Sequence, residues 1–312
     1  MKLRYQKNIT HKALLCLLVC IVTNNIIFSQ QSALFPEYNY NPFIINPAYA
    51  GLLSNTEATL SNTGFSDFEG APRHFNFSFH TPLQKGKMGL GGAIISDKIG
   101  VTNSTNAFVA YSYKIFFDFK SNRPYWQDYQ AGSLSFAITA GVQQFQDNLL
   151  DLGITDDISF SENINTSIPT IGAGFLFNHA KFYAGISTPN LLGLKLASNE
   201  GVNLEFPIYG YFGYYFFSNR FKDFLIKPSL FLRHEKGAPL LADFNVAVSY
   251  KNKLELGAGY RSTSSINLLA GIYLADSFRV IYHYNLAPNN SPLGNTQGFI
   301  LSLRLGNGYN AN

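Results

Sequence analysis

The sequence has 312 residues, of which 46% are hydrophobic and only 13% are charged. A soluble domain carries about 25% charged residues, so this composition argues against an ordinary soluble protein. The mean hydropathy of +0.00 also argues against a bundle of transmembrane helices.

Residues 1–30 have the form of a cleaved secretory signal peptide. Its apolar core at residues 13–22 is too short to span a bilayer. The basic residues of this leader, which all precede its apolar core, are Lys2, Arg4, Lys7 and Lys12. Removing these four of the 23 basic residues leaves 19, which balance the 19 acidic residues. The mature chain therefore has no net charge, and nothing indicates a nucleic-acid partner.

Both cysteines, Cys16 and Cys20, lie in this leader. Cleavage after residue 30 therefore predicts a mature protein without disulfides or thiol chemistry. Lipidation at Cys20 is the alternative, but Val19 stands where Gly or Ala usually precedes a lipidated cysteine.

Residues 31–54 are predicted to form an irregular segment, which contains NYNPFIINPAYAG at positions 39–51. Asn-Pro pairs favour turns, and the residue before a proline is pushed out of the α region. The pattern predicts neither a helix nor an ordinary strand here. The prolines would lower the entropy lost on ordering, and the tyrosines offer flat contact area with a polar tip.

From residue 55 to residue 306 the chain alternates between apolar and polar residues, which is the period of a β-strand. In the stretch 73–80, for example, Phe75, Phe77 and Phe79 face one side and His74 and Asn76 the other. About fourteen such segments can be counted. We expect them to begin near residues 55, 73, 88, 105, 131, 169, 181, 206, 223, 241, 252, 265, 276 and 296. Residues 307–312 remain as a short tail.

Two architectures suit many alternating strands in an exported protein. A soluble β-sandwich would expose charged faces, whereas a membrane barrel would turn its apolar faces to lipid and its polar faces to a lumen. The low charge and the even strand number favour an all-β, antiparallel transmembrane barrel, which must close because lipid supplies no hydrogen bonds. Long connections at 121–129 and 146–168, against short turns elsewhere, are also typical of outer-membrane barrels.

Charged residues on the inward side of the late segments form a candidate polar network in the lumen. Its members are Arg233, Asp243, Glu255, Arg261, Arg279 and Arg304. Because both signs are mixed, we interpret them as an ion-paired interior, with a pore or ligand path as the alternative.

No recognised catalytic or metal-binding motif is present, so the sequence predicts no enzyme, no metal site and no cofactor. Asp147, Asp151, Asp156 and Asp157 cluster in a predicted external loop. Carboxylates suit calcium, but the spacing is not that of an EF-hand, so a solvated loop is the preferred interpretation.

The opening of the mature chain closely resembles that of the PorP/SprF family of type IX secretion system membrane proteins. The matching positions are Tyr38, Asn41, Pro42, Asn46, Pro47, Ala48, Tyr49, Ala50 and Gly51. Further matching blocks lie at residues 70–72, 78–82, 89–92, 97–100, 182–189, 227–229 and 257–261.

This resemblance implies an outer-membrane barrel of Bacteroidetes-type cells, similar to fatty-acid transporters, with the N-terminal segment in the lumen or at the periplasmic mouth. It implies a non-enzymatic part of the secretion and gliding machinery. The implied partners are outer-membrane lipid, periplasmic peptidoglycan-linked secretion subunits and a large secreted adhesin with a C-terminal sorting domain. The matching positions of the segment would plug the lumen or dock a partner. The alternative function is a porin or transporter for small or hydrophobic solutes.

Overall fold

The computed structural model describes residues 36–65, 70–118, 131–154, 157, 160–179, 181–192, 207–217, 223–236, 238–288 and 294–309. The predicted signal peptide therefore lies outside the described residues. Residues 1–32 and 237–239 form a unit separate from the remaining chain, and everything below concerns that remaining chain.

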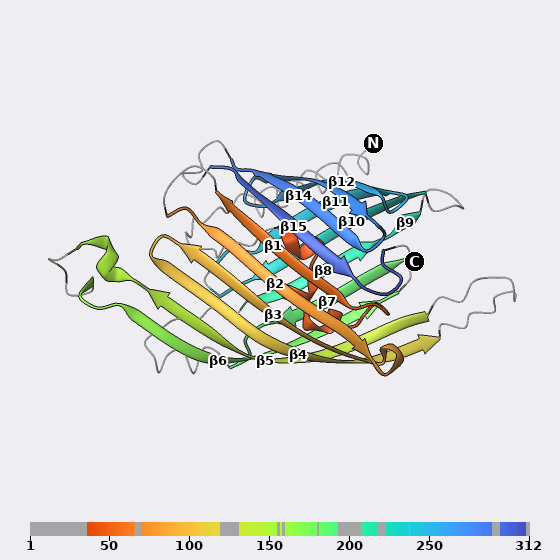
Figure 1. Cartoon of the computed structure of the whole chain (residues 1–312), viewed down its shortest axis with the longest axis horizontal. Coiled ribbons are helices and arrows are strands. Elements are labelled where there is room, and N and C mark those ends of the chain that lie inside the picture. The colour runs from red at the N-terminus through yellow and green to blue at the C-terminus, as the bar shows by residue number, and fades with distance from the viewer. Residues whose placement is uncertain are drawn as a thin grey trace, which may run out of the picture. The chain divides into compact units, whose positions relative to one another are not determined.

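The unit is built from antiparallel strands, and each is hydrogen-bonded to the next along the chain except at β8 and β9, which both pair with β10 (Figure 1). The strands are β1 (Glu57–Phe65), β2 (Arg73–Leu83), β3 (Met88–Ile99), β4 (Thr102–Asp118), β5 (Ala131–Asp147), β6 (Ile164–Asn178), β7 (Phe182–Thr188), β8 (Ile208–Tyr214), β9 (Phe216–Phe217), β10 (Phe224–His234), β11 (Leu241–Tyr250), β12 (Leu254–Arg261), β13 (Ser265–Leu274), β14 (Phe278–Leu286) and β15 (Thr296–Arg304). The short helices, all of the 3-10 type, are η1 (Pro36–Asn39), η2 (Pro42–Ile44), η3 (Pro47–Tyr49), η4 (Gln84–Gly86) and η5 (Leu149–Leu152).

The sheet closes on itself. The first strand pairs with the last from Glu57 opposite Arg304 to Phe65 opposite Thr296. Strands β8 and β9 both pair with β10 and are separated by Tyr215 alone, so they act as one interrupted strand. The result is a closed barrel of fourteen antiparallel strands, as the alternation predicts.

The two faces of the barrel differ in chemistry. On β2, Phe75, Phe77 and Phe79 are each about two-fifths exposed on the outside, while Asn76 and Ser78 are buried inside. The same division holds on β11 and β12, where Phe244 and Leu256 are exposed and Asp243 and Glu255 are buried. An apolar outside is what lipid requires, and the polar inside needs partners of its own.

The ends of the barrel also differ. We call the end at which β1 begins and β15 ends the turn end, because η4 and the tight connections 251–253 and 275–277 lie there. The opposite, or loop, end carries the long connections 148–163 and 189–207. Residues 121–129 lie outside the described residues, but β4 runs toward the turn end. β5 begins at the same end, so the chain joins these two strands there.

Candidate functional site

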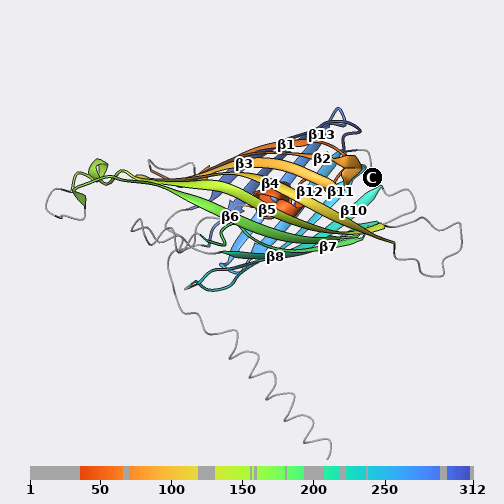
Figure 2. The same cartoon turned by 90° about the horizontal axis from the view of Figure 1, so that it is seen from below.

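The N-terminal segment, residues 36–51, lies inside the barrel (Figures 1 and 2). It consists of η1, η2 and η3, and each of these turns begins at a proline. Proline suits the first position of a helical turn, where its missing N–H would have no partner. Asn41 and Asn46, which precede two of the prolines, have φ of −131° and −136°, as the residue before proline prefers. The prediction that this stretch contains no helix is thus wrong at these three short turns of 3-10 helix. None of them continues into a longer helix.

Asn46 is the most completely bonded residue of the segment and is fully buried. Its Oδ1 accepts from the backbone N–H of Ala48 at 2.8 Å, which caps η3. Its Nδ2 donates to the Phe175 carbonyl at 2.8 Å, to the Tyr211 hydroxyl at 2.8 Å and to the Ile186 carbonyl at 3.4 Å. One side chain thereby ties the segment to β6, β7 and β8.

Asn41 makes the corresponding attachment on the opposite wall. Its Nδ2 donates to Oδ1 of Asn76 at 3.2 Å, and its Oδ1 accepts from the Ser78 hydroxyl at 3.0 Å. The next aromatic residue, Phe43, is 1% exposed and lies where a Cβ on Gly91 would come within 2.6 Å of its ring. Small residues on the inner wall thus leave room for the segment.

Tyr38 binds an ion pair that belongs to the predicted lumen network. Its hydroxyl donates to Asp243 at 2.9 Å, and Arg261 donates to the same carboxylate through two nitrogens at 2.7 Å each. The ring stacks on Phe231 at a centroid distance of 4.4 Å. Burial raises the pKa of Tyr38 well above its usual value, so the hydroxyl stays a donor to Asp243.

Tyr40 bonds with a second buried carboxylate, that of Glu255. The Tyr40 hydroxyl donates at 3.0 Å, Tyr273 donates at 2.6 Å, and Lys227 forms an ion pair with Glu255 at 2.5 Å. The backbone of Tyr40 is held as well, because Arg279 donates to its carbonyl at 2.7 Å. Burial raises the pKa of Tyr40 in the same way.

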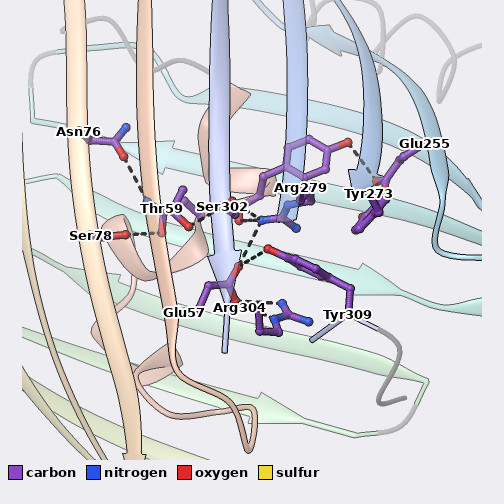
Figure 3. A network of polar contacts seen from close by, with 12 residues as sticks. Glu57, Thr59, Asn76, Ser78, Glu255, Tyr273, Arg279, Ser302, Arg304 and Tyr309 are labelled. Carbon is purple, nitrogen blue, oxygen red and sulfur yellow. Dashed lines mark hydrogen bonds and ion pairs between the residues drawn. The ribbon is translucent and has the colours of Figure 1, made fainter. Parts of the chain in front are cut away.

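The carboxylate of Glu57, at the start of β1, is contacted by side chains from three other parts of the chain (Figure 3). Arg279 approaches its carboxylate at 3.3 Å, Arg304 at 2.9 Å and the Tyr309 hydroxyl at 3.1 Å. The ring of Tyr309 lies over both guanidinium groups, at 5.0 Å from Arg279 and 4.0 Å from Arg304. The C-terminal tail therefore packs beside the paired strands β1 and β15, at which the barrel closes.

The segment is also fixed at both of its ends. Near its start, the hydroxyl of Thr63 donates to the Glu37 carboxylate and lies 2.9 Å from Nε2 of His283. At its finish, the buried Lys114 donates to the carbonyls of Gly51 and Gly86. Its ammonium group thus joins the segment to η4 at the turn end.

The predicted network residues lie at different places inside the barrel. Five of these residues face the segment or its neighbours: Asp243 and its partner Arg261, Glu255, and the pair of arginines Arg279 and Arg304. Arg233 pairs with Glu235, two residues away, at 2.7 Å.

Sequence reasoning missed several partners of the network: Glu37, Glu57, Lys114, Lys227, Tyr273 and Tyr309. Glu57 shares the alternation of Thr59, Ser61 and Thr63, so its inward direction could have been found. The position of Tyr309 depends on the fold of the tail and left no periodic signal.

A cavity of about 630 Å³ opens beside the segment at the turn end. Its wall is unusually rich in tyrosine: Tyr38, Tyr40, Tyr49, Tyr183, Tyr211, Tyr215, Tyr273 and Tyr309. Lys181 and Lys227 add positive charge, and Glu255 adds negative charge. A volume of this size is within the range of small-molecule sites.

The acidic loop shows no calcium geometry among its described members. Asp147 accepts a hydrogen bond from Thr102 at 2.9 Å, while Asp156 lies outside the described residues. Within the described ranges, no three His, Cys, Asp or Glu side chains are grouped as metal ligands would be.

A closed barrel with an apolar outside and a polar, ion-paired inside is a transmembrane β-barrel of the bacterial outer membrane. The helices in the described part of the chain are all too short or too polar to cross a membrane. The chain belongs to the PorP/SprF family, because the family model described as "Type IX secretion system membrane protein PorP/SprF" matches residues 27–305. The predicted family and location are confirmed.

Solved structures of outer-membrane proteins are similar to this chain at low identity. Omp33 of Acinetobacter baumannii matches with a TM-score of 0.43 and 9% identity over 82% of this chain and 100% of its own. A mutant of TodX, a monoaromatic hydrocarbon channel, matches with a TM-score of 0.42 and 8% identity over 84% and 93%. Phospholipase A of Escherichia coli matches with a TM-score of 0.35 and 10% identity over 82% and 97%. No curated protein matches the sequence.

Proposed function

We propose that this barrel is a non-enzymatic docking component of the type IX secretion and gliding machinery. In this role it assists export or surface attachment of a large adhesin-like protein with a C-terminal sorting domain. It also contacts periplasmic, peptidoglycan-linked subunits of the same system. Family membership supports the coarse assignment.

The observation that carries the docking role is the attachment of the N-terminal segment across the barrel interior. Asn41 bonds with β2 and Asn46 with β6, β7 and β8, while Tyr38 and Tyr40 bond with carboxylates on β11 and β12. An interior filled in this way suits a rigid scaffold better than an open pore. The segment is thus a plug in our proposal, and its buried side chains serve partner docking only by shaping the cavity beside it.

The turn end supports the contact with periplasmic subunits. Bacterial barrels keep short turns on the periplasmic side, so the tyrosine-rich cavity opens toward the periplasm in this orientation. Tyrosine combines a large apolar area with a polar tip, which is why it is enriched at protein interfaces.

The cavity is also the observation that favours the alternative, a transporter for small or hydrophobic solutes. A deletion strain and a reconstituted protein separate the two. The docking function predicts that deletion removes one large adhesin from the cell surface and that the pure barrel conducts few ions. Normal surface display in the deletion strain would refute docking. Conductance or solute uptake by the reconstituted barrel, with normal display, would establish transport.

A further inference from the structure

The connection between β5 and β6 projects from the loop end and carries η5 (Figures 1 and 2). β4 and β5 have 17 residues each and β6 has 15, whereas a membrane strand needs about 9–11. Part of the extra length lies at the turn end, where β4 continues past β3 after Tyr113. At the loop end, residues 164–172 of β6 continue beyond its last pair with β7, Ala173 with Thr188, and stay paired with β5, so these two strands form a projection beyond β7.

Polar residues separate this projection from the lipid-facing surface. The last mainly apolar outward row consists of Ala107, Val142 and Pro169. The next two outward rows are wholly polar: Thr105, Gln144 and Ser167, followed by Asn103, Gln146 and Asn165. The lipid boundary therefore falls near Val142.

The tip above these polar rows is apolar again. Leu150, Leu152 and Ile154 are 56%, 46% and 43% exposed. They lie roughly 20 Å farther along the chain direction than Val142, at about 3.3 Å per strand residue. Lipid at the barrel wall does not cover them, and exposed apolar clusters of this kind mark interaction sites.

The tip has a defined structure. The helix η5 ends at Gly153, whose φ of +67° suits glycine and whose N–H donates to the Leu150 carbonyl at 3.1 Å. Asn163, on the returning chain, accepts from the backbone N–H of Leu150 at 3.0 Å. The apolar side chains are thus presented on an ordered turn and lose little freedom on binding.

The negative charge of the tip indicates the chemistry of its partner. Residues 147–163 contain five acidic residues and no lysine or arginine. Among the described ones, Asp151, Asp157 and Glu162 are exposed, and Glu162 precedes Asn163, which bonds with Leu150. A complementary surface is apolar and rimmed by lysine or arginine.

We propose that this tip, Leu150, Leu152 and Ile154 with Asp151 and Glu162, docks an exported protein through a basic-rimmed apolar surface outside the cell. The inference rests on the proposed function, because it takes the partner to be a protein that the secretion system delivers. It adds the surface on which that protein is held.

A photocrosslinking amino acid at position Leu152, introduced in intact cells, tests the docking surface directly. The same amino acid at Thr263, an exposed turn residue at the same end, is the control. We expect an adduct with one exported protein from Leu152 and none from Thr263. Adducts with lipid alone, with a second copy of this chain, or equally at both sites would overturn the proposal, as would no adduct.

Two variants, each carrying the crosslinker at Leu152, probe the chemistry of the contact with the exported protein. Leu150→Ser with Ile154→Ser should weaken docking about tenfold or more, because each leucine-sized side chain contributes at least about a factor of ten when buried. Asp151→Asn with Glu162→Gln should lower the adduct several-fold and reduce its salt sensitivity. An adduct yield unchanged by both variants would contradict the inference. Heat-modifiable migration checks that each barrel has folded.

The deletion strain keeps the two proposals distinguishable. Loss of adhesin display without a Leu152 adduct would leave the proposed function standing and overturn the docking tip. A Leu152 adduct in cells whose deletion counterpart displays the adhesin normally would support the tip and refute the proposed function.

Discussion

Asn46 donates a 2.8 Å hydrogen bond to the hydroxyl of Tyr211, which follows it by 165 positions in the chain. The bond joins the N-terminal segment to the middle of the barrel wall. Because Asn46 also bonds with Ala48 and the carbonyl of Phe175, it couples the local turn to the closed sheet. The segment and barrel should therefore unfold together.

Replacing Asn46 with Ala should lower the free energy of unfolding by roughly 3 kcal/mol, because several buried groups lose their partner at once. Urea unfolding in detergent, followed by the loss of heat-modifiable migration, measures the effect. Asn148→Ala is a suitable comparison, since Asn148 is exposed and makes no side-chain cap. Equal midpoints for the two variants would show that Asn46 is not an anchor.

Gly174 makes the position of Asn46 possible. A Cβ at Gly174 would come within 2.2 Å of Oδ1 of Asn46, whereas a Cβ at Gly210 would meet nothing closer than 3.9 Å. Gly174→Ala should therefore destabilise the barrel by about 1–3 kcal/mol through overpacking, and Gly210→Ala should not. If combining Gly174→Ala with Asn46→Ala costs as much as the two separate changes together, the two sites are independent and this explanation is wrong.

The barrel could be predicted from the sequence because its signal is repeated in every strand. Phe75 and Phe77 outside against Asn76 and Ser78 inside already define the two faces. Of the fourteen expected strand starts, twelve fall within two residues of the structure, while those expected near 105 and 169 begin earlier, at Thr102 and Ile164. Period two is set by the strand itself and needs no knowledge of distant contacts.

The partners inside the barrel could not be predicted in the same way. Alternation shows that Asp243 and Arg261 face inward, but which strands lie opposite depends on closure and stagger. The bond between Tyr40 and Glu255 spans 215 positions and involves a segment without periodicity. Arg233 likewise lies buried inside, but its pairing with Glu235, two residues away, could not be told from the alternation alone.

Glu57 is the shared counter-charge of Arg279 and Arg304, and its carboxyl side chain is 7% exposed. Glu57→Gln leaves two buried guanidinium groups without a carboxylate, so we expect a loss of about 3–5 kcal/mol. The half-exposed pair of Lys251 with Asp223, at 3.9 Å, is the control, and Asp223→Asn should cost at most about 1 kcal/mol. Similar losses for both variants would contradict the role assigned to Glu57.

Tyr38 and Tyr40 should make the barrel sensitive to alkaline pH. Burial raises the pKa of both above the ordinary value of 10.0, so the folded state holds their protons more tightly than the unfolded state. Their contribution is complete below pH 10 and is lost as the pH rises above it. Ionisation would also place negative charge beside Asp243 and Glu255.

The double variant Tyr38→Phe with Tyr40→Phe tests this. It should be less stable than the parent at pH 8, because two hydrogen bonds to carboxylates are lost. Its stability should fall less steeply between pH 10 and pH 12. The unfolding midpoints of the parent and the double variant are compared across that range, and the variant of the outward tyrosine, Tyr250→Phe, is the control. Parallel curves for parent and double variant would show that these hydroxyls do not control the alkaline limb.

Replacing Asn46 and Pro47 together separates a plug from a docking element. The change removes the cap of η3 and the preset φ of its first residue, and with them the attachment to β6 and β8. If the segment is a plug, the reconstituted variant should conduct ions that the parent excludes, or lose heat-modifiable migration at a lower temperature. A partner-docking role predicts a stable, tight barrel that no longer co-purifies with its periplasmic partner. Conductance across planar bilayers distinguishes the two. The control Pro288→Ala, at an exposed position outside every strand, should leave the conductance unchanged.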